Sequence, residues 1–198
     1  SKKLTLSQMF RKLLNSELGR ADIDQYKQLE KLPITIVLDN VRSRHNIGSA
    51  FRTSDAFRVN EIILCGISST PPSAEIHKSA LGAEFSVDWR YFEKTEDALK
   101  ELKSQGYTII SIEQTENSVS LDKFVSQEQK LSPDAKYAII FGNEVHGISQ
   151  AAVDMSEMAI EIPQYGTKHS LNVSVTIGII LYSLSWRLLQ AMDSSNLR

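Results

Sequence analysis

The chain has 198 residues and a formal net charge of −2 at pH 7, with 41% hydrophobic and 23% charged residues. This composition is typical of a globular protein and argues against extensive disorder, and the slightly acidic balance argues against a general nucleic-acid binder. The only cysteine, Cys65, excludes an internal disulfide, and because no metal-ligand spacing surrounds it, a reducing, cytoplasmic compartment is expected.

Residues 1–32 are predicted to form a helical extension ahead of the main domain. Their apolar residues recur with the spacing of an amphipathic helix: Leu6, Met9, Phe10, Leu13 and Leu14. The segment has neither a long apolar core nor a small-residue cleavage site, so it is not expected to be a signal peptide.

Residues 33–198 are predicted to form one α/β domain. Five apolar runs have the length of buried strands: 34–39, 61–66, 107–112, 137–142 and 158–162. Helical patterns separate some of them, with Asn46 and Thr95 as candidate N-caps. Strands that are apolar throughout and alternate with helices predict a mostly parallel sheet with helices on both faces.

The segment 171–190 fits two structures. Apolar and polar residues alternate over 173–179, as in a strand, whereas small residues recur every four positions over 170–178, as on a helix. The length of the segment and its helix-forming residues favour a helix. Its most apolar part, 171–186, is shorter than the roughly 20 residues of a membrane span, so no membrane association is expected.

Three segments place polar residues and glycines directly after predicted strands, where open α/β sheets bind ligands. The first is DNVRSRHNIGSAFRTSDAF (39–57). Asn46 and Gly48 lie at the expected helix start, where free backbone amides can receive an anion, and the Arg52 guanidinium can grip a phosphate. The simpler alternative is that Asn46 only caps the helix and Arg52 only pairs with Asp55 at the surface.

The second segment is FGNEVHGIS (141–149), which directly follows the fourth predicted strand. Gly142 and Gly147 permit the tight turns and close backbone approach that a nucleoside ligand needs, and Glu144 can be a polar anchor at the strand end. An ordinary loop with a solvated glutamate would show the same pattern, so this segment alone is weak support for a ligand site.

The third segment is IPQYGTKHSLNVSVTIG (162–178), in which Pro163 and Gly166 mark a loop. Ser170 and Asn172 then enter an apolar segment. Polar residues at the start of a buried segment need partners, so these two either cap the helix or contact a ligand.

Other cofactor and metal signatures are missing from the sequence. The four histidines are scattered, with no i, i+4 pair and no cysteine or acidic cluster nearby, so no metal site is expected: His45, His77, His146 and His169. The glycine-rich motifs that hold dinucleotides or nucleoside triphosphates are absent, as is a nucleophilic serine elbow. This argues against an α/β enzyme that uses a different nucleotide cofactor.

Together and in this order, the three segments resemble motifs 1, 2 and 3 of the SpoU (TrmH-like) branch of the SPOUT superfamily. The matching residues are NIGSAFRT (46–53), FGNEVHGI (141–148) and IPQYGTKHSLNVSV (162–175). The resemblance extends over residues 33–190. It departs from the family at Arg58, where glycine is frequent, and this affects no expected catalytic residue.

The resemblance implies an α/β fold with a C-terminal trefoil knot, and an RNA 2′-O-ribose methyltransferase that uses S-adenosylmethionine on tRNA or rRNA and acts as a homodimer. It implies cofactor contacts, largely through backbone, at Gly142, Ile162 and Leu171, to which we add Gln164. It implies a catalytic set made of Asn46, Arg52, Glu144, Ser170 and Asn172.

Arg52 of one subunit is expected to approach the cofactor of the other. Because a guanidinium has a pKa above about 12, we expect Arg52 to position phosphate and ribose electrostatically rather than to act as a base. RNA would contact local basic residues, for which the candidates are Lys2, Lys3, Arg11, Lys12, Arg42, Arg44, His45, Lys168 and His169. The alternative is a catalytically inactive RNA-binding or RNA-processing protein on the same fold, and retention of the whole catalytic set argues against it.

Overall fold

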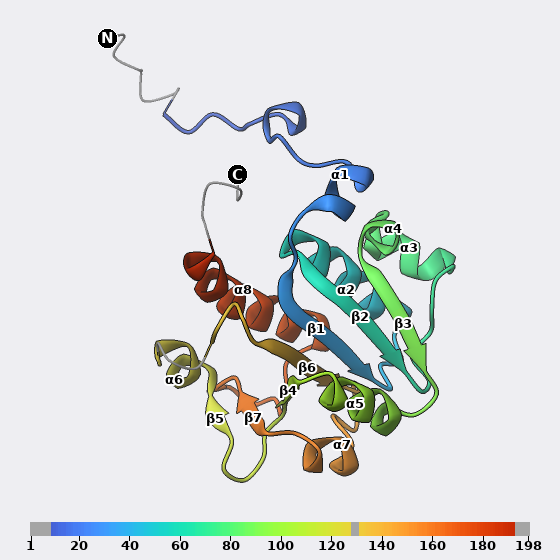
Figure 1. Cartoon of the computed structure of the whole chain (residues 1–198), viewed down its shortest axis with the longest axis vertical. Helices are drawn as coiled ribbons and strands as arrows, with labels where there is room; N and C mark the ends of the chain where they lie inside the picture. Colours follow the sequence, from blue (N-terminus) through green and yellow to red (C-terminus); the bar gives the residue numbers. More distant parts are fainter. Residues whose placement is uncertain (1–8, 128–130, 193–198) are drawn as a thin grey trace.

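A computed structural model describes residues 9–127 and 131–192 of the chain. Its centre is a seven-stranded sheet in the order β3-β2-β1-β6-β4-β7-β5, and every neighbouring pair is parallel (Figure 1). The strands are β1 (Leu32–Asp39), β2 (Val59–Cys65), β3 (Asp88–Phe92), β4 (Tyr107–Ile112), β5 (Val119–Ser120), β6 (Lys136–Gly142) and β7 (Met158–Glu161). The predicted parallel α/β sheet is confirmed.

Two strands were not predicted from the sequence, and both lie at the ends of the sheet. β3 contains charged and exposed residues because only one side of it is paired, and β5 has two residues, which is too short for a periodic pattern. Edge strands are often short or charged, so an apolar run is a poor guide to them.

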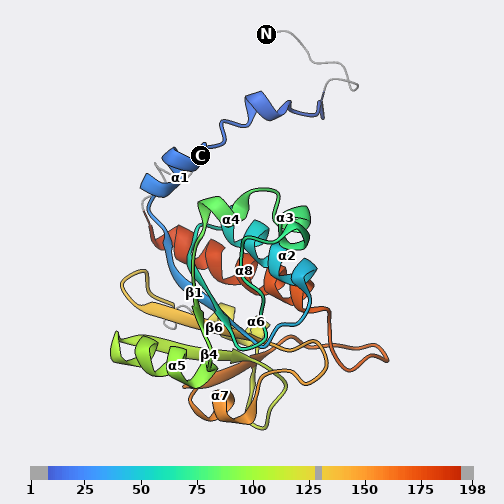
Figure 2. The same ribbon diagram turned by 90° about the vertical axis from the view of Figure 1, so that its right-hand side faces the viewer.

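Helices cover both faces of the sheet. They are α1 (Ile23–Gln28), α2 (Arg44–Ala56), α3 (Ala74–Ala80), α4 (Ala83–Ser86), α5 (Thr95–Ser104), α6 (Leu121–Ser126), α7 (Gln150–Asp154) and α8 (Val173–Ala191). The larger apolar core lies between the sheet and the layer that contains α2, α3 and α8, and the smaller core lies under α5 and α7 on the other face (Figure 2). The two cores confirm the prediction that helices cover both faces of a parallel sheet.

The structure decides in favour of a helix for the ambiguous segment 171–190. α8 runs from Val173 to Ala191 and buries Ile177, Ile180, Leu181, Leu184 and Leu188, which recur at helical spacing. Within the described part of the chain, no helix is both long and apolar enough to cross a membrane. The trefoil knot stays a prediction.

The predicted N-terminal amphipathic helix does not form in residues 9–14, and residues 1–8 lie outside the described part. Residues 11–14 lack regular structure, a single 3-10 turn follows at Asn15–Glu17, and Phe10 is 90% exposed. The segment extends away from the sheet in both views (Figures 1 and 2). The described members of its apolar stripe, Met9, Phe10, Leu13 and Leu14, are all more than half exposed, and short helices are marginal without apolar packing.

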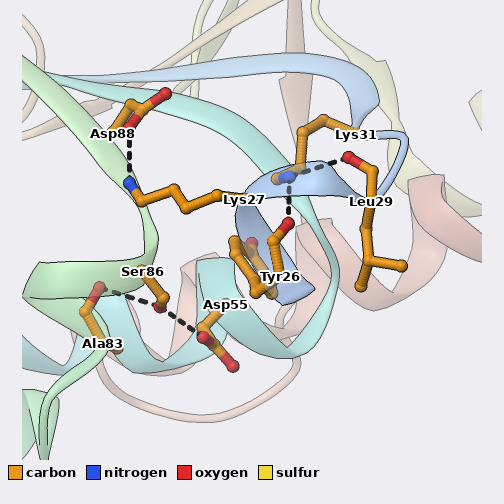
Figure 3. A network of polar contacts seen from close by, with 8 residues as sticks. All are labelled: Tyr26, Lys27, Leu29, Lys31, Asp55, Ala83, Ser86 and Asp88. Atoms are coloured by element: carbon orange, nitrogen blue, oxygen red, sulfur yellow. Dashed lines mark hydrogen bonds and ion pairs between the residues drawn. The ribbon is translucent and has the colours of Figure 1, made fainter. Parts of the chain in front are cut away.

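α1 is attached to the domain by its buried Tyr26, which belongs to the larger core, and by an ion pair to β3 (Figure 3). Lys27 Nζ forms an ion pair with Asp88 at 2.6 Å, and Lys31 Nζ donates to the carbonyl oxygens of Tyr26 and Leu29 at 2.6 and 2.8 Å. Within residues 9–32, the α-helical part of the extension is therefore α1, which is anchored beside β3.

Candidate active site

The three motif segments leave the same edge of the sheet. Asp39 at the end of β1 lies in register with Gly142 at the end of β6, and β4 separates β6 from β7. The loops of motifs 1 and 2 therefore start side by side, and that of motif 3 starts two strands away. Parallel strands gather these loops at their carboxyl ends, where ligands bind in such sheets.

Motifs 1 and 2 are joined by Glu144. Its carboxylate accepts hydrogen bonds from the backbone N–H groups of Arg42 and Ser43, both at 2.9 Å, and from the Asn46 side-chain amide at 3.1 Å. Burial opposes ionisation of Glu144, but these hydrogen bonds from Ser43, Arg42 and Asn46 favour the anion and lower its pKa. The pair Asn46–Glu144 from the predicted catalytic set is thus brought together.

This arrangement corrects two expectations for the start of α2. Asn46 is not the N-cap, because Ser43 caps the helix and its side chain accepts from the Asn46 N–H. The anion received beside the helix start is the protein's own Glu144 carboxylate. Gly48 has a packing role, since a Cβ there would lie 2.0 Å from Ser79 Oγ on α3.

The loop of motif 2 is a tight turn closed on itself. Asn143 and Gly147 form an antiparallel bridge, and the Asn143 side-chain oxygen accepts from the N–H groups of Val145 and His146. A Cβ at Gly142 would lie 2.2 Å from the Gly147 carbonyl carbon, and Gly147 has a φ of +67°. Both glycines are therefore required by the close turn, as predicted for this segment.

Asp39 is a buried carboxylate that the sequence analysis did not single out. Its oxygens accept from the Thr95 hydroxyl at 2.6 Å and from the Ser149 N–H at 2.9 Å. Thr95 consequently does not cap α5, which has Lys94 as its N-cap. The signal that could have identified Asp39 is its place directly after an apolar strand, at the ligand-binding edge of the sheet.

Motifs 2 and 3 are joined by the two residues that follow β4, which the sequence analysis also missed. Glu113 accepts from the Ile148 N–H at 3.0 Å, and Gln114 Nε2 donates to the His169 carbonyl oxygen at 2.8 Å. One polar pair at the end of β4 thus holds a loop on each side of that strand.

The motif 3 loop offers backbone groups to a ligand. Between Pro163 and Leu171, the bond from Gln114 to His169 is the one hydrogen bond that the loop makes with described residues. Ile162 and Gln164 are half-buried, while Leu171 is more exposed. Free amides and carbonyls beside apolar side chains suit a nucleoside, so the predicted cofactor contacts fit S-adenosylmethionine.

The two polar residues of motif 3 have different positions. Asn172 is the N-cap of α8, and its side-chain oxygen accepts from the backbone N–H groups of Ser174 and Val175. Ser170 is exposed and lies before the helix. Neither side chain forms a hydrogen bond with Glu144 or Asn46.

Arg52 lies apart from the rest of the predicted catalytic set. Its side chain is exposed on α2 and makes no hydrogen bond or ion pair with the described residues, including Asp55, which accepts from Ser86 instead. It lines a pocket of about 980 Å³ with residues 18–23 and Arg58. Arg52 therefore does not form the surface ion pair with Asp55 that the simpler alternative predicts, and its pocket is not lined by the motif loops of its own chain.

The described residues hold no group of three histidine, cysteine or acidic side chains that could bind a metal. Lys2 and Lys3, two candidates for RNA contact, lie outside the described part of the chain.

Comparison with known proteins gives a consistent result. A family model described as the SpoU rRNA Methylase family matches residues 33–182. The chain is 32% identical over 158 residues to the 23S rRNA (guanosine-2′-O-)-methyltransferase RlmB of Neisseria meningitidis, covering 80% of this chain and 60% of that protein. It is 26% identical over 187 residues to the tRNA (guanosine(18)-2′-O)-methyltransferase of Borreliella burgdorferi, covering 90% and 82%.

Among solved structures, the AdoMet-bound rRNA methyltransferase from Sinorhizobium meliloti superposes with a TM-score of 0.71 at 25% identity. The match covers 83% of this chain and 60% of the other. The chain thus spans less than two thirds of the Neisseria and Sinorhizobium proteins.

Proposed function

The chain belongs to the SpoU rRNA Methylase family, and from this premise we propose that it is an S-adenosylmethionine-dependent RNA 2′-O-ribose methyltransferase. The observation that carries the proposal is the gathering of three motif loops at one sheet edge, two of them joined through Glu144 and two through the end of β4.

The cofactor would lie between the loops of motifs 2 and 3, against Gly142, Ile162, Gln164 and Leu171. When bound, S-adenosylmethionine supplies an electrophilic methyl group. The chain's own contribution is to position the cofactor, because the backbone amides and carbonyls between Pro163 and Leu171 can form hydrogen bonds with its nucleoside. Holding donor and acceptor in line converts a bimolecular step into an effectively unimolecular one.

The acceptor ribose would lie beside Asn46, Ser170 and Asn172, with Arg52 as a fixed positive charge. A guanidinium stays protonated, so Arg52 can hold a phosphate and stabilise charge on the ribose oxygen but is a poor base. Glu144 is occupied by three donors, and its role is to fix motif 1 to motif 2.

We infer that the enzyme is a homodimer with Arg52 acting on the partner's site. Two observations support this inference: Arg52 is separate from its own chain's motif loops, and α8 has an exposed apolar stripe. Along it, Val175, Tyr182 and Trp186 are 50%, 63% and 37% exposed and repeat at positions i, i+7 and i+11. A stripe of this kind on a long helix commonly packs against another chain.

The substrate would be tRNA or rRNA, in a cytoplasmic setting. Since the chain carries a net charge of −2, RNA must be held by a local group of cations. Arg42 lies on the motif 1 loop, and Lys168 and His169 lie on the motif 3 loop, so both sides of the site offer phosphate contacts. Arg44 is less available for such a contact, because it forms an ion pair with Glu75.

The test is methyl transfer from labelled S-adenosylmethionine to total RNA from a strain that lacks this protein. We expect label in 2′-O-methylated nucleosides of one size fraction, which identifies the RNA. An Arg52→Ala variant should lose about 100-fold or more in kcat/KM, because a charge at the reacting centre is removed.

Lys100→Ala is the matched control, since Lys100 is an exposed cation on α5, away from the motif loops. Cofactor binding without any methylation, on every RNA fraction, would favour the inactive RNA-binding protein. Unchanged methylation by the Arg52 variant would contradict its assigned role.

A further inference from the structure

A second pocket of about 730 Å³ lies beside the motif 1 segment, on the side of the sheet edge formed by β2 and β3. It is bounded by the start of α2, the loop after β2, the start of α3 and strand β3. The residues that matter for its chemistry are Arg44, Ser69, Thr70, Glu75, Trp89 and Tyr91. Its volume is within the range of small-ligand sites, about 300–1,000 Å³.

Two aromatic side chains form one wall of the pocket. Trp89 and Tyr91 alternate along β3 and therefore lie on the same face of this edge strand. Trp89 packs partly against the larger core, whereas Tyr91 is 45% exposed and fixed by its hydroxyl, which donates to the Gly66 carbonyl oxygen at 2.7 Å. The indole N–H has no hydrogen-bond partner among the described residues, so it offers a donor.

The polar groups of the pocket do not favour a bare phosphate. Arg44 donates through Nε to the Ser69 hydroxyl at 3.1 Å and pairs with Glu75 at 3.2 Å, so the two charges offset each other. What remains are hydroxyls, a carboxylate acceptor and aromatic surface. A nucleobase matches this set, because it stacks on aromatic rings and hydrogen-bonds through its edges.

The pocket is tied to the motif loops by a continuous set of hydrogen bonds. Ser68, in the pocket wall, is buried and accepts from the Val41 N–H at 2.9 Å. Asn40 accepts from the Ile67 N–H at 3.0 Å, and its carbonyl oxygen accepts from the Asn143 side chain of motif 2 at 2.9 Å. These hydrogen bonds therefore hold the pocket wall in a fixed position relative to the motif 1 and motif 2 loops.

We propose that this pocket binds a second, unpaired base of the RNA substrate, while the methylated nucleotide lies at the motif loops. The proposal rests on the proposed function. It requires the RNA to present at least one unstacked base near the target, as in a loop or bulge. Recognition at this pocket would select the RNA by shape and by base identity, independently of the methyl donor.

The chain offers a direct reporter, because its two tryptophans are Trp89 and Trp186. In a Trp186→Phe background all indole fluorescence comes from Trp89. This protein would be titrated with single-stranded RNA hexamers of adenosine, cytidine, guanosine or uridine. We expect saturable quenching by the hexamer whose base fits, and affinity about 5- to 100-fold weaker after Tyr91→Ala.

Matched variants separate stacking from general damage. Tyr91→Phe keeps the ring and should retain binding, as should Phe85→Ala, which removes an exposed aromatic on α4 outside the pocket. With full-length substrate RNA, Tyr91→Ala should raise KM by a similar factor and leave the Kd for S-adenosylmethionine unchanged.

Hexamers that bind without quenching Trp89, together with an unchanged KM in Tyr91→Ala, would overturn the base pocket while leaving the methyltransferase intact. A wild-type protein that neither binds S-adenosylmethionine nor methylates RNA would instead overturn the proposed function, and the pocket proposal would fall with it.

Discussion

Glu144 is the residue on which the junction of motifs 1 and 2 depends. Each of its carboxylate oxygens accepts at least one hydrogen bond, and the donors lie as many as 102 residues away in the sequence. A glutamine at this position has one acceptor oxygen and presents N–H groups to a donor. Replacement therefore leaves at least one of these donors without a partner.

We predict that Glu144→Gln lowers the free energy of unfolding by about 1–3 kcal/mol at pH 7, since bonds to a charged group are lost. Denaturant unfolding would measure this, with Glu116→Gln, an exposed glutamate, as control. Because folding lowers the pKa of Glu144 below its ordinary 4.5, the carboxylate stabilises the protein above that value. The difference between the two proteins should shrink as pH falls through the lowered pKa, and a pH-independent difference would contradict this account.

Among the secondary-structure elements, α8 links the motif 3 loop to the core. Its N-cap is Asn172, and its buried side chains belong to the larger core on one face of the sheet. Asn172 therefore has two candidate roles, since it caps the helix in the structure and also belongs to the predicted catalytic set. A capping role needs a side-chain oxygen, whereas contact with a ribose hydroxyl can also use the amide nitrogen.

We predict that Asn172→Ala lowers stability by about 1 kcal/mol, as for other lost N-caps, and that Asn172→Asp keeps stability close to wild type. Thermal or denaturant unfolding of both variants checks the capping role. If the amide contacts the acceptor ribose, Asn172→Asp should lose kcat while it stays folded and binds S-adenosylmethionine. Full activity of Asn172→Asp would assign the residue to capping alone.

At the scale of the whole molecule, the fold places Arg52 away from the motif loops of its own chain, and this bears on how the active site is completed. Arg52 lines a pocket with the segment around α1 and not with the motif loops of its own chain. If the active site is completed across a two-fold interface, each subunit gives its partner an Arg52 and receives one in return.

Two inactive variants should therefore complement each other. Arg52→Ala lacks the charge, and Leu171→Arg is expected to block the proposed cofactor loop. Co-expressed chains that mix at random should regain about a quarter of wild-type activity, because half of the dimers carry one complete site. Each variant alone is the control. If Arg52 acts within its own chain, no mixed dimer has a complete site and no activity returns.

Local sequence patterns were sufficient for the parallel core of the sheet, and they favoured the C-terminal helix without excluding a strand. The five predicted strands correspond to β1, β2, β4, β6 and β7. The glycines of motif 2 also follow from local geometry, since Gly147 needs a left-handed φ and Gly142 a close backbone approach. Periodicity and turn chemistry depend on neighbouring residues, so a sequence reveals them directly.

Tertiary structure alone decided which polar groups meet. Glu144 receives donors from motif 1, Glu113 and Gln114 join motifs 2 and 3, and Trp89 and Tyr91 form a pocket at an edge strand that no apolar run predicted. These contacts join residues far apart in sequence, and they form because the order of strands in the sheet places the loops after those strands next to each other. The N-terminal stripe likewise forms no helix over residues 9–14, where its apolar side chains are exposed in the described structure, because a short helix depends on tertiary packing that its own sequence cannot supply.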